Sequence, residues 1–201
     1  MTVRVIVPPQ PIVTPADIPG AHAPDDAAVR AMIQAVTEEI DGPDGWLGRA
    51  LGPQTLEMSG HFGSQRIRLP YVPIIDLVSI ITVSEDGDEA PADPATYRLE
   101  DGEVVVSPGA TWVIEPKHRI RYIAGYNGSD EGKTGAVPER ARQAIILSVQ
   151  DLMRARTVSP ILRSETVDGV GSKSFLDGDK LTAIVERTCD RLLSTLRVNV
   201  L

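Results

Sequence analysis

The spacing of apolar residues changes twice along this chain, and these changes limit the folds that it can adopt. Residues 29–40 carry apolar side chains at helical spacing, whereas apolar and polar residues alternate through residues 54–126. Helical spacing returns after Pro138 and again from about Asp179. We therefore predict an α+β fold. A bundle of about three to four helices would carry an antiparallel β subdomain inserted between the first helix and the later ones.

Turn-forming residues mark both ends of the first predicted helix. Asp25 or Asp26 can cap its N-terminus, and the glycines and proline of residues 42–45 end it. The apolar segment 46–51 then predicts a short helical turn packed against this helix.

Two further helices are predicted in the last third of the chain. One extends from Pro138, a residue favoured at the first helical position, to about Arg156. The other begins near Asp179. Residues 157–178 between them contain a proline and several glycines, which predict irregular structure.

Alternation in the middle block predicts strands with one buried and one exposed face. The predicted strands cover residues 54–59, 64–69, 78–84, 96–100, 103–107, 111–115 and 118–124. Asp101-Gly102 between two of them is a strong signal for a tight hairpin turn.

These elements divide the chain into three parts. Residues 1–13 alternate and then become rich in proline, which predicts an extended arm. Residues 14–196 predict a single domain, with the β insertion at about residues 54–126. Residues 197–201 alternate like a strand and form a C-terminal tail suited to pairing with another chain.

Composition argues against several classes of protein. The formal net charge of -8 does not suit a protein that binds nucleic acid by neutralising phosphates. The single cysteine, Cys189, rules out an intrachain disulfide, and its place in an apolar helical stripe predicts a buried side chain. The histidines are too far apart to form a metal-ligand pattern, and no apolar run is long enough for a membrane span. We therefore expect no metal, no cofactor and no membrane partner.

Residues 128–134 contain Gly-Lys-Thr between a predicted strand and a predicted helix, as a phosphate-binding loop does. That motif needs four residues between its first glycine and the Gly-Lys pair, but only three separate Gly128 from Gly132. Asp130 and Glu131 would also repel phosphate. We expect an exposed surface loop here, and a small nucleotide-binding enzyme is the alternative function from a different class.

The chain also carries a series of short segments, each weak alone, whose order and spacing together are specific. They are Pro8-Pro9, Gly45-Trp46-Leu47-Gly48-Arg49-Ala50-Leu51, residues 53–57, Ile67-Arg68-Leu69-Pro70, residues 78–80, Tyr97-Arg98-Leu99, residues 120–126, Val137-Pro138-Glu139 and residues 164–172. In this order they resemble the head–tail connector (adaptor) proteins of long-tailed bacteriophages and gene transfer agents. The resemblance covers roughly residues 5–175.

The resemblance implies a structural role and no enzymatic activity. Proteins of this family form a ring, typically twelve-fold, under the portal protein at the capsid vertex. The ring extends the DNA channel and provides the docking surface for the next neck or tail protein. The implied partners are the portal protein, a tail-side stopper or neck protein, further copies of this chain, and double-stranded DNA that passes through without sequence-specific binding.

The implied location is the neck of a phage virion or gene transfer agent particle, between capsid and tail, after synthesis in the bacterial cytoplasm. Another neck component, such as a stopper or a tail terminator, is the alternative within the same class. The acidic balance suits a channel wall that repels phosphate and lets DNA slide.

No catalytic residues are expected, and the candidate sites are contact surfaces. The tail residues Arg197, Val198, Asn199, Val200 and Leu201 are predicted to bind the portal protein. The arginines of the helix after Pro138 are predicted to contact the next copy in the ring; they are Arg140, Arg142, Arg154 and Arg156. The arm formed by residues 1–13 is expected to reach a neighbouring subunit or the tail-side ring.

Overall fold

A computed structural model describes residues 1–110, 117–157, 164–167, 171–174 and 178–199. The fold is α+β, as predicted, and the chain divides into two compact units. The first unit contains Met1–Ile12, Glu38–Val137 and Leu196–Leu201, and the second contains Val13–Thr37 and Pro138–Thr195. The N-terminal segment and the C-terminal tail therefore belong to the same unit as the β block.

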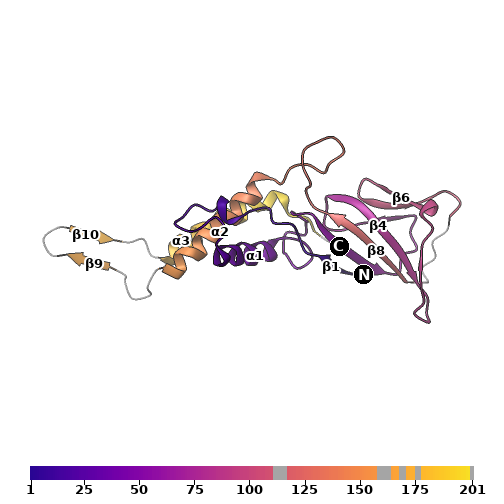
Figure 1. The fold of residues 1–201 in the computed structure, drawn as a ribbon, viewed down its shortest axis with the longest axis horizontal. Helices are drawn as coiled ribbons and strands as arrows, with labels where there is room; N and C mark the ends of the chain where they lie inside the picture. The colour runs from indigo at the N-terminus through magenta and orange to yellow at the C-terminus, as the bar shows by residue number, and fades with distance from the viewer. Residues whose placement is uncertain (111–116, 158–163, 168–170, 175–177, 200–201) are drawn as a thin grey trace. The chain divides into compact units, whose positions relative to one another are not determined.

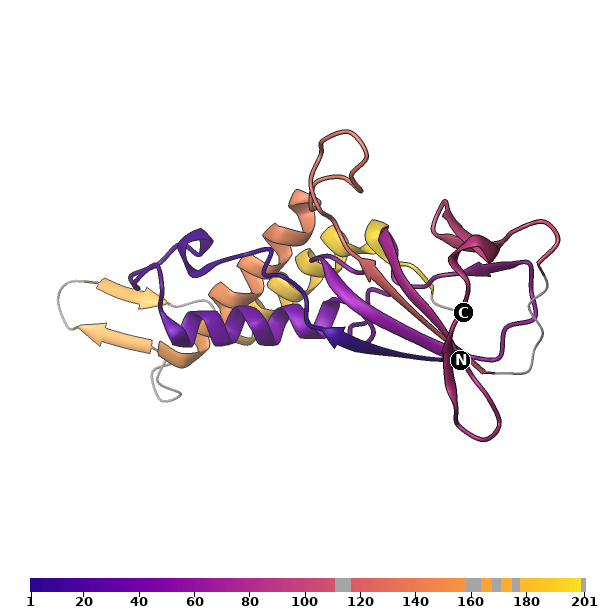
Figure 2. The ribbon, with the colours of Figure 1, turned by 45° about the vertical axis from the view of Figure 1, so that its right-hand side comes forward.

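A five-stranded antiparallel sheet is the larger sheet of the first unit (Figures 1 and 2). In spatial order its strands are β1 (Thr2–Val7), β2 (Gln54–Gly60), β8 (Lys117–Ala124), β4 (Ile74–Val83) and β5 (Glu89–Pro91). The central strand β8 follows the predicted alternation, because every second residue from His118 to Ala124 is buried. One face of this sheet therefore packs on the core.

A three-stranded sheet completes the first unit. Its strand order is β3 (Arg66–Arg68), β7 (Glu103–Val106) and β6 (Tyr97–Glu100), and the short 3-10 helix η2 (Pro94–Thr96) leads into β6. The predicted hairpin at Asp101-Gly102 joins β6 to β7. Both turn residues have positive φ angles, 48° and 77°, as the favoured two-residue hairpin turn requires.

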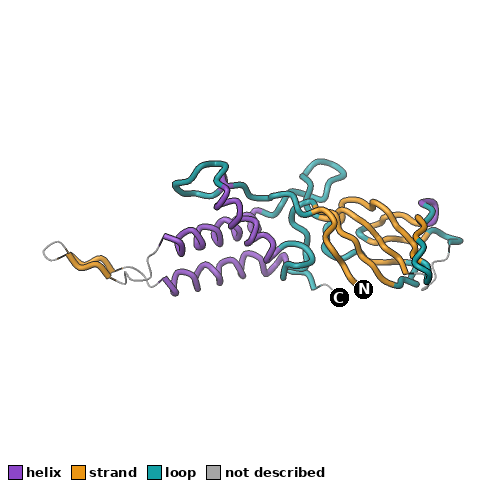
Figure 3. Tube along the Cα trace, turned by 60° about the horizontal axis from the view of Figure 1, so that its bottom comes forward, coloured by secondary structure: helices purple, strands orange, loops and turns teal. Residues whose placement is uncertain are grey.

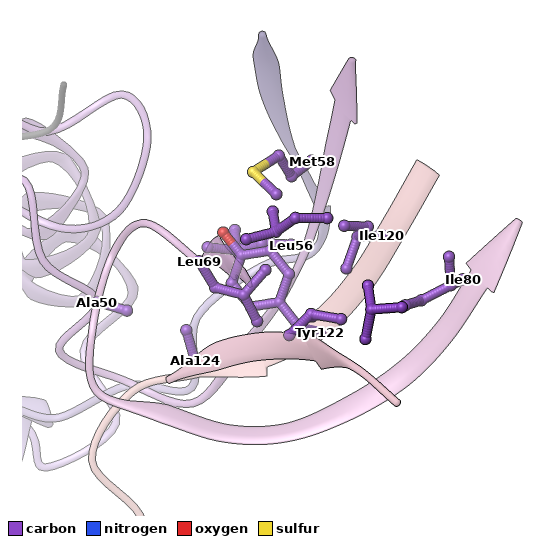
Figure 4. Packing of buried hydrophobic residues seen from close by; sticks show 11 residues of the cluster. Ala50, Leu56, Met58, Leu69, Ile80, Ile120, Tyr122 and Ala124 are labelled. Atoms are coloured by element: carbon purple, nitrogen blue, oxygen red, sulfur yellow. The ribbon is translucent and has the colours of Figure 1, made fainter. Parts of the chain in front are cut away.

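Apolar side chains from both sheets form one hydrophobic core (Figure 4). The larger sheet contributes residues such as Leu56, Ile120 and Tyr122, and the smaller sheet contributes Ile67 and Val104. Tyr122 is fully buried, and its hydroxyl donates a hydrogen bond of 3.1 Å to the Pro70 carbonyl oxygen. The alternation in the sequence thus places about every second residue of a strand such as β8 in this core.

The second unit contains most of α1 (Ala27–Ile40) together with α2 (Glu139–Thr157) and α3 (Gly178–Leu193), drawn in purple in Figure 3. Asp26 caps α1, because its Oδ1 accepts the backbone N–H groups of Ala28 at 2.8 Å and Val29 at 3.1 Å. The shorter elements of this unit are η1 (Pro15–Asp17), β9 (Ser164–Val167) and β10 (Gly171–Ser174), with η3 (Ser194–Leu196) at its border.

Helices α2 and α3 lie side by side and antiparallel. The half-buried Cys189 on α3 has its Sγ atom 3.4 Å from the Ser148 hydroxyl on α2, and Arg140 at the start of α2 bonds to Thr195 just after α3. The strands β9 and β10 pair with each other between the two helices in the chain.

The predicted helical turn over residues 46–51 is wrong. The chain forms turns there, because Gly48 has a φ angle of 67° and because the Asp41 carboxylate binds the N–H groups of Leu51 and Gly52. Residues 1–13 begin extended, as predicted, but Thr2–Val7 is paired with β2 of its own chain.

Most predicted strands of the middle block are present, although their ends differ by a few residues. The largest shift is at β4, which begins at Ile74 instead of residue 78. The strands β5, β9 and β10 were not predicted, because acidic or glycine-containing segments carry little β signal. The predicted strand at residues 111–115 lies outside the described residues.

Candidate partner-binding surfaces

The C-terminal tail, predicted to bind the portal protein, lies against its own chain as far as it is described. The carbonyl oxygen of Leu196 accepts a hydrogen bond of 2.9 Å from Arg49 Nε, and the Val198 N–H donates one of 2.9 Å to the Leu47 carbonyl oxygen. Between them, the Arg197 guanidinium lies 5.9 Å from the centre of the Trp46 ring, in cation–π range. Of the five predicted tail residues, Val200 and Leu201 lie outside the described residues.

The segment that holds the tail is residues 45–51, which we name the docking loop. Its residues Leu47, Ala50 and Leu51 are fully buried and anchor it, whereas Trp46 remains 38% exposed. Gly45 approaches the end of α1 so closely that a Cβ atom there would lie 2.3 Å from the Ile40 carbonyl carbon. Glycine is therefore required at this position by close backbone contact.

Asp41 holds the docking loop in place through buried hydrogen bonds. It is only 5% exposed, and its carboxylate accepts hydrogen bonds from Leu51 N–H at 2.7 Å, Gly52 N–H at 3.3 Å and Gln54 Nε2 at 3.0 Å. Burial raises the pKa of Asp41 to about 6, and the hydrogen bonds act in the opposite direction. No local pattern in the sequence indicates this role, because the contact joins a helix end to residues ten or more positions later.

A cleft of about 410 Å³ lies beside the tail. It is lined by Tyr71, by Gly45, Trp46 and Gly48 of the docking loop, and by residues 197–199. Tyr71 has a φ angle of 61°, an uncommon conformation for a bulky residue. A parallel β-bridge pairs Tyr71 with Arg49, so the strained residue is held directly against the docking loop.

The four arginines predicted for the ring interface fall into two separate pairs on α2. Arg140 and Arg142 lie at its start, whereas Arg154 and Arg156 lie about 20 Å further along at 1.5 Å rise per residue. Arg140 bonds to Thr195, and Arg142 Nη2 lies 3.2 Å from Asp17 Oδ1. The first pair is thus engaged within its own unit.

Exposed apolar side chains gather near the second pair of arginines. Leu152 near the end of α2 is 41% exposed, and Leu181 and Ile184 near the start of α3 are 36% and 55% exposed. These ends adjoin because the two helices are antiparallel. We name these three residues the helix-pair patch; exposed large apolar side chains that lie near one another are typical of interaction sites.

A charged ladder crosses three strands of the larger sheet, on the face opposite the hydrophobic core. Arg4 on β1, Glu57 on β2 and Arg121 on β8 lie in register. The buried Glu57 carboxylate accepts hydrogen bonds from Arg4 Nη2 at 2.7 Å and Arg121 Nη2 at 2.9 Å. Burial alone raises the pKa of Glu57, but the bonds from Arg121 and Arg4 outweigh it and lower the pKa below its usual value.

The segment resembling a phosphate-binding loop uses its own polar groups to close itself. Thr134 N–H donates to Asn127 Oδ1 at 2.9 Å, and the Thr134 hydroxyl donates to the Gly125 carbonyl oxygen at 2.8 Å. Lys133 Nζ lies 3.6 Å from Asp130 Oδ2, and α2 begins only at Glu139. The Lys and Thr that would bind phosphate in such a motif are occupied within this loop.

Two further observations concern only the described part of the chain. Histidine, cysteine and acidic side chains there do not gather in groups of three or more that could hold a metal ion. None of the helices there combines the length and apolar character of a membrane span.

The fold is similar to that of chains in solved gene transfer agent (GTA) particles. The neck of a native GTA particle computed with C12 symmetry contains a chain with TM-score 0.61 and 17% identity, over 100% of this chain and 98% of that one. A chain in the neck of an empty GTA particle computed with C6 symmetry gives 0.60 and 18% with the same coverage. A chain of the virion of a native GTA particle gives 0.55 and 17%, again with the same coverage.

Family models and curated proteins give no match. The described part of the chain therefore has a fold similar to that of these GTA particle chains.

Proposed function

We propose that this protein is a structural component of the neck of a gene transfer agent or phage particle, with no catalytic role. The observation that carries the proposal is the fold match over the full length of both chains, with neck chains of GTA particles. Of the neck components, the adaptor fits best, since the sequence segments that resemble connector proteins extend over most of the same length. The chain would join the neck after synthesis in the bacterial cytoplasm.

As an adaptor, the protein forms a ring of twelve copies under the portal protein and extends the DNA channel. The C12 and C6 symmetries of the similar necks support a ring of this order. A closed ring needs two different, complementary surfaces on each copy. The helix-pair patch with Arg154 and Arg156 is one such surface, because it combines exposed apolar area with charge at its edge.

The tail, residues 197–201, binds the portal protein, and the tail-side stopper or neck protein binds the opposite end of the ring. The proposed channel wall is acidic, in keeping with the net charge of -8, so DNA passes without being held. The N-terminal arm contacts a neighbouring subunit or the tail-side ring through residues outside its pairing with β2.

The test is to mix the purified protein with the portal protein of the same particle and image the product. We expect a twelve-fold ring on the tail side of the portal. A chain lacking residues 197–201 should remain folded but fail to attach. Attachment only to a preformed tail tube would identify a tail terminator instead, and no association with any neck protein would contradict the proposal.

A further inference from the structure

The docking loop binds the main chain of the C-terminal tail. The Leu47 carbonyl oxygen accepts the Val198 N–H, and Arg49 Nε donates to the Leu196 carbonyl oxygen, both at 2.9 Å. These are the peptide groups on either side of Arg197, so the docking loop binds the tail's main chain at two successive peptide groups, as peptide-binding sites do. The contact therefore has the form of recognition and is not merely a chain end lying on a surface.

Side-chain recognition accompanies the backbone contacts. Arg197 is the residue between the two hydrogen-bonded peptide groups, and its guanidinium lies over the Trp46 ring. Arg49, which binds Leu196, is itself positioned by a 2.9 Å hydrogen bond from its Nη1 to the Tyr126 hydroxyl. The docking loop and Tyr126 thus form a site that binds one cation, the Arg197 guanidinium, and two peptide groups of the tail.

The docking loop is anchored in the core, whereas the tail is bound only by the few contacts described above and stays largely exposed. Leu47 and Leu51 are fully buried, and Asp41 holds the loop through the Leu51 and Gly52 N–H groups. In the tail, Arg197 and Asn199 are exposed and Val198 is half-buried. A rigid receptor with a lightly held ligand favours exchange of the ligand while the receptor keeps its shape.

We propose that the docking loop stores the C-terminal tail in the free protein and that the tail leaves it to bind the portal protein. The second half of this inference rests on the proposed function. Addition of the tail as a strand to another protein would use the Val198 N–H and the Leu196 carbonyl, which the docking loop already occupies. Storage and portal binding through these groups are therefore mutually exclusive.

Trp46 gives a direct readout of storage. The chain has two tryptophans, and Trp112→Phe leaves Trp46 as the only indole fluorophore. In that background Arg197→Gln should shift the Trp46 emission to longer wavelength and raise its quenching by acrylamide about two-fold, because the cation over the ring is lost. Arg197→Lys, which keeps a cation, should change both signals much less.

The matched control is Arg98→Gln, which removes an exposed arginine of the same unit that pairs with Glu100. It should leave the Trp46 signals unchanged. If Arg197→Gln gives the same signals as this control, the tail is not stored at Trp46 and the inference is overturned.

Release is tested by adding the portal protein to the Trp112→Phe chain and measuring binding by co-sedimentation. Binding with a shift of Trp46 emission toward that of Arg197→Gln supports release, and binding without a shift overturns it. Absence of binding contradicts the proposed function and the release step together, whereas storage is decided by the Arg197 variants alone.

A receptor variant that leaves the tail intact gives a kinetic check. Trp46→Ala should increase the association rate with the portal protein by about two- to five-fold, since the tail then spends less time stored. An unchanged or slower rate, with the circular dichroism spectrum unaltered, would count against storage as a brake on assembly.

Discussion

The buried side chain of Asp41 determines the conformation of a loop for which the sequence predicts only the end of a helix. Residues 42–45 contain the signals that end a helix, but the geometry that follows depends on the Asp41 carboxylate and its three N–H donors. Because burial raises its pKa to about 6, its protonation state changes under mildly acidic conditions.

The free energy of unfolding should depend on pH because of Asp41. A raised pKa means that the folded state holds the proton more tightly than the unfolded state, where the value is near 3.8. The stabilisation from this group is therefore complete below pH 3.8 and is lost as pH rises through about 6. At 1.36 kcal/mol per pKa unit, the total is roughly 3 kcal/mol.

We predict that the free energy of unfolding of the wild type, relative to Asp41→Asn, falls by roughly 2–3 kcal/mol between about pH 4 and pH 7. Urea denaturation of both chains across this range measures it. Asp44→Asn, at an exposed position in the same turn, is the control and should track the wild type. A pH-independent difference between the wild type and Asp41→Asn would contradict the raised pKa.

Glu57, at the centre of the charged ladder, should stabilise the protein in its ionised form, whereas Asp41 should do so in its protonated form. Glu57→Gln leaves two arginines facing a neutral side chain, and we expect a loss of about 2 kcal/mol in the free energy of unfolding, less than for a fully buried pair because Arg4 is largely exposed. Arg4→Ala should cost less than half as much. Glu100→Gln, in a surface pair with Arg66, should change stability by under about 0.5 kcal/mol.

Because the pKa of Glu57 is lowered, its stabilisation is present above the usual value of 4.5 and is lost as pH falls through the lowered folded value. The deficit of Glu57→Gln should therefore shrink in acid, the reverse of the trend at Asp41. Equal deficits at pH 7 and at pH 3 would refute this account.

At the scale of elements, the docking loop depends on close approach to the end of α1. Gly45→Ala would place a Cβ atom 2.3 Å from a backbone carbon, so we expect destabilisation of more than about 2 kcal/mol. Loss of the near-ultraviolet signal of the Trp46 environment should accompany it. Gly20→Ala meets only side-chain atoms, the nearest at 3.3 Å, and should cost under about 1 kcal/mol. Similar effects of the two substitutions would rule out close packing as the reason for Gly45.

Periodicity predicted the elements whose faces differ in polarity. The alternation of β8 and the stripe of α1 each reflect one face packed on a core, and the Asp101-Gly102 turn follows from local backbone preference. Thr2–Val7 alternates as well, but its partner β2 begins more than forty residues later, so nothing local showed that it would complete a sheet.

The contact surfaces were harder to predict than the elements. The tail residues alternate like a strand, yet residues 196 and 197 contact Arg49 and Trp46, which are distant in sequence. The arginines of α2 looked equivalent in the sequence, whereas Arg140 and Arg142 bond within the chain. Which side chains meet is decided by tertiary packing, and a single sequence carries little information on it.

At the scale of the whole molecule, the proposed ring requires surface that the isolated chain leaves uncovered. Ile184→Gln in the helix-pair patch should leave the free energy of unfolding within about 0.5 kcal/mol, because the side chain is 55% exposed. It should nevertheless reduce ring assembly on the portal protein at least ten-fold, as counted by electron microscopy. Thr182→Gln, at an exposed position on the same helix, is the control. Normal rings from Ile184→Gln would place the subunit contact elsewhere.

The net charge gives a second prediction at this scale. With an excess of eight acidic groups, the free protein should not bind double-stranded DNA measurably at about 0.15 M salt, and lowering the salt should not produce tight binding. Fluorescence anisotropy with a labelled duplex measures this. Micromolar binding that weakens steeply with added salt would show a phosphate-binding surface and contradict a passive channel wall.

The loop between β8 and α2 is closed at its base by the Asn127–Thr134 hydrogen bonds and by the Gly128–Gly135 bridge. Its outer residues 129–131 are exposed, and a Cβ atom on Gly132 would meet nothing within 4 Å. A short peptide inserted there would lengthen a hairpin that is already clamped and would leave β8 and α2 undisturbed. This position is therefore suited to an epitope or gold label that would test, in images of whole particles, the proposed place of the subunit in the neck.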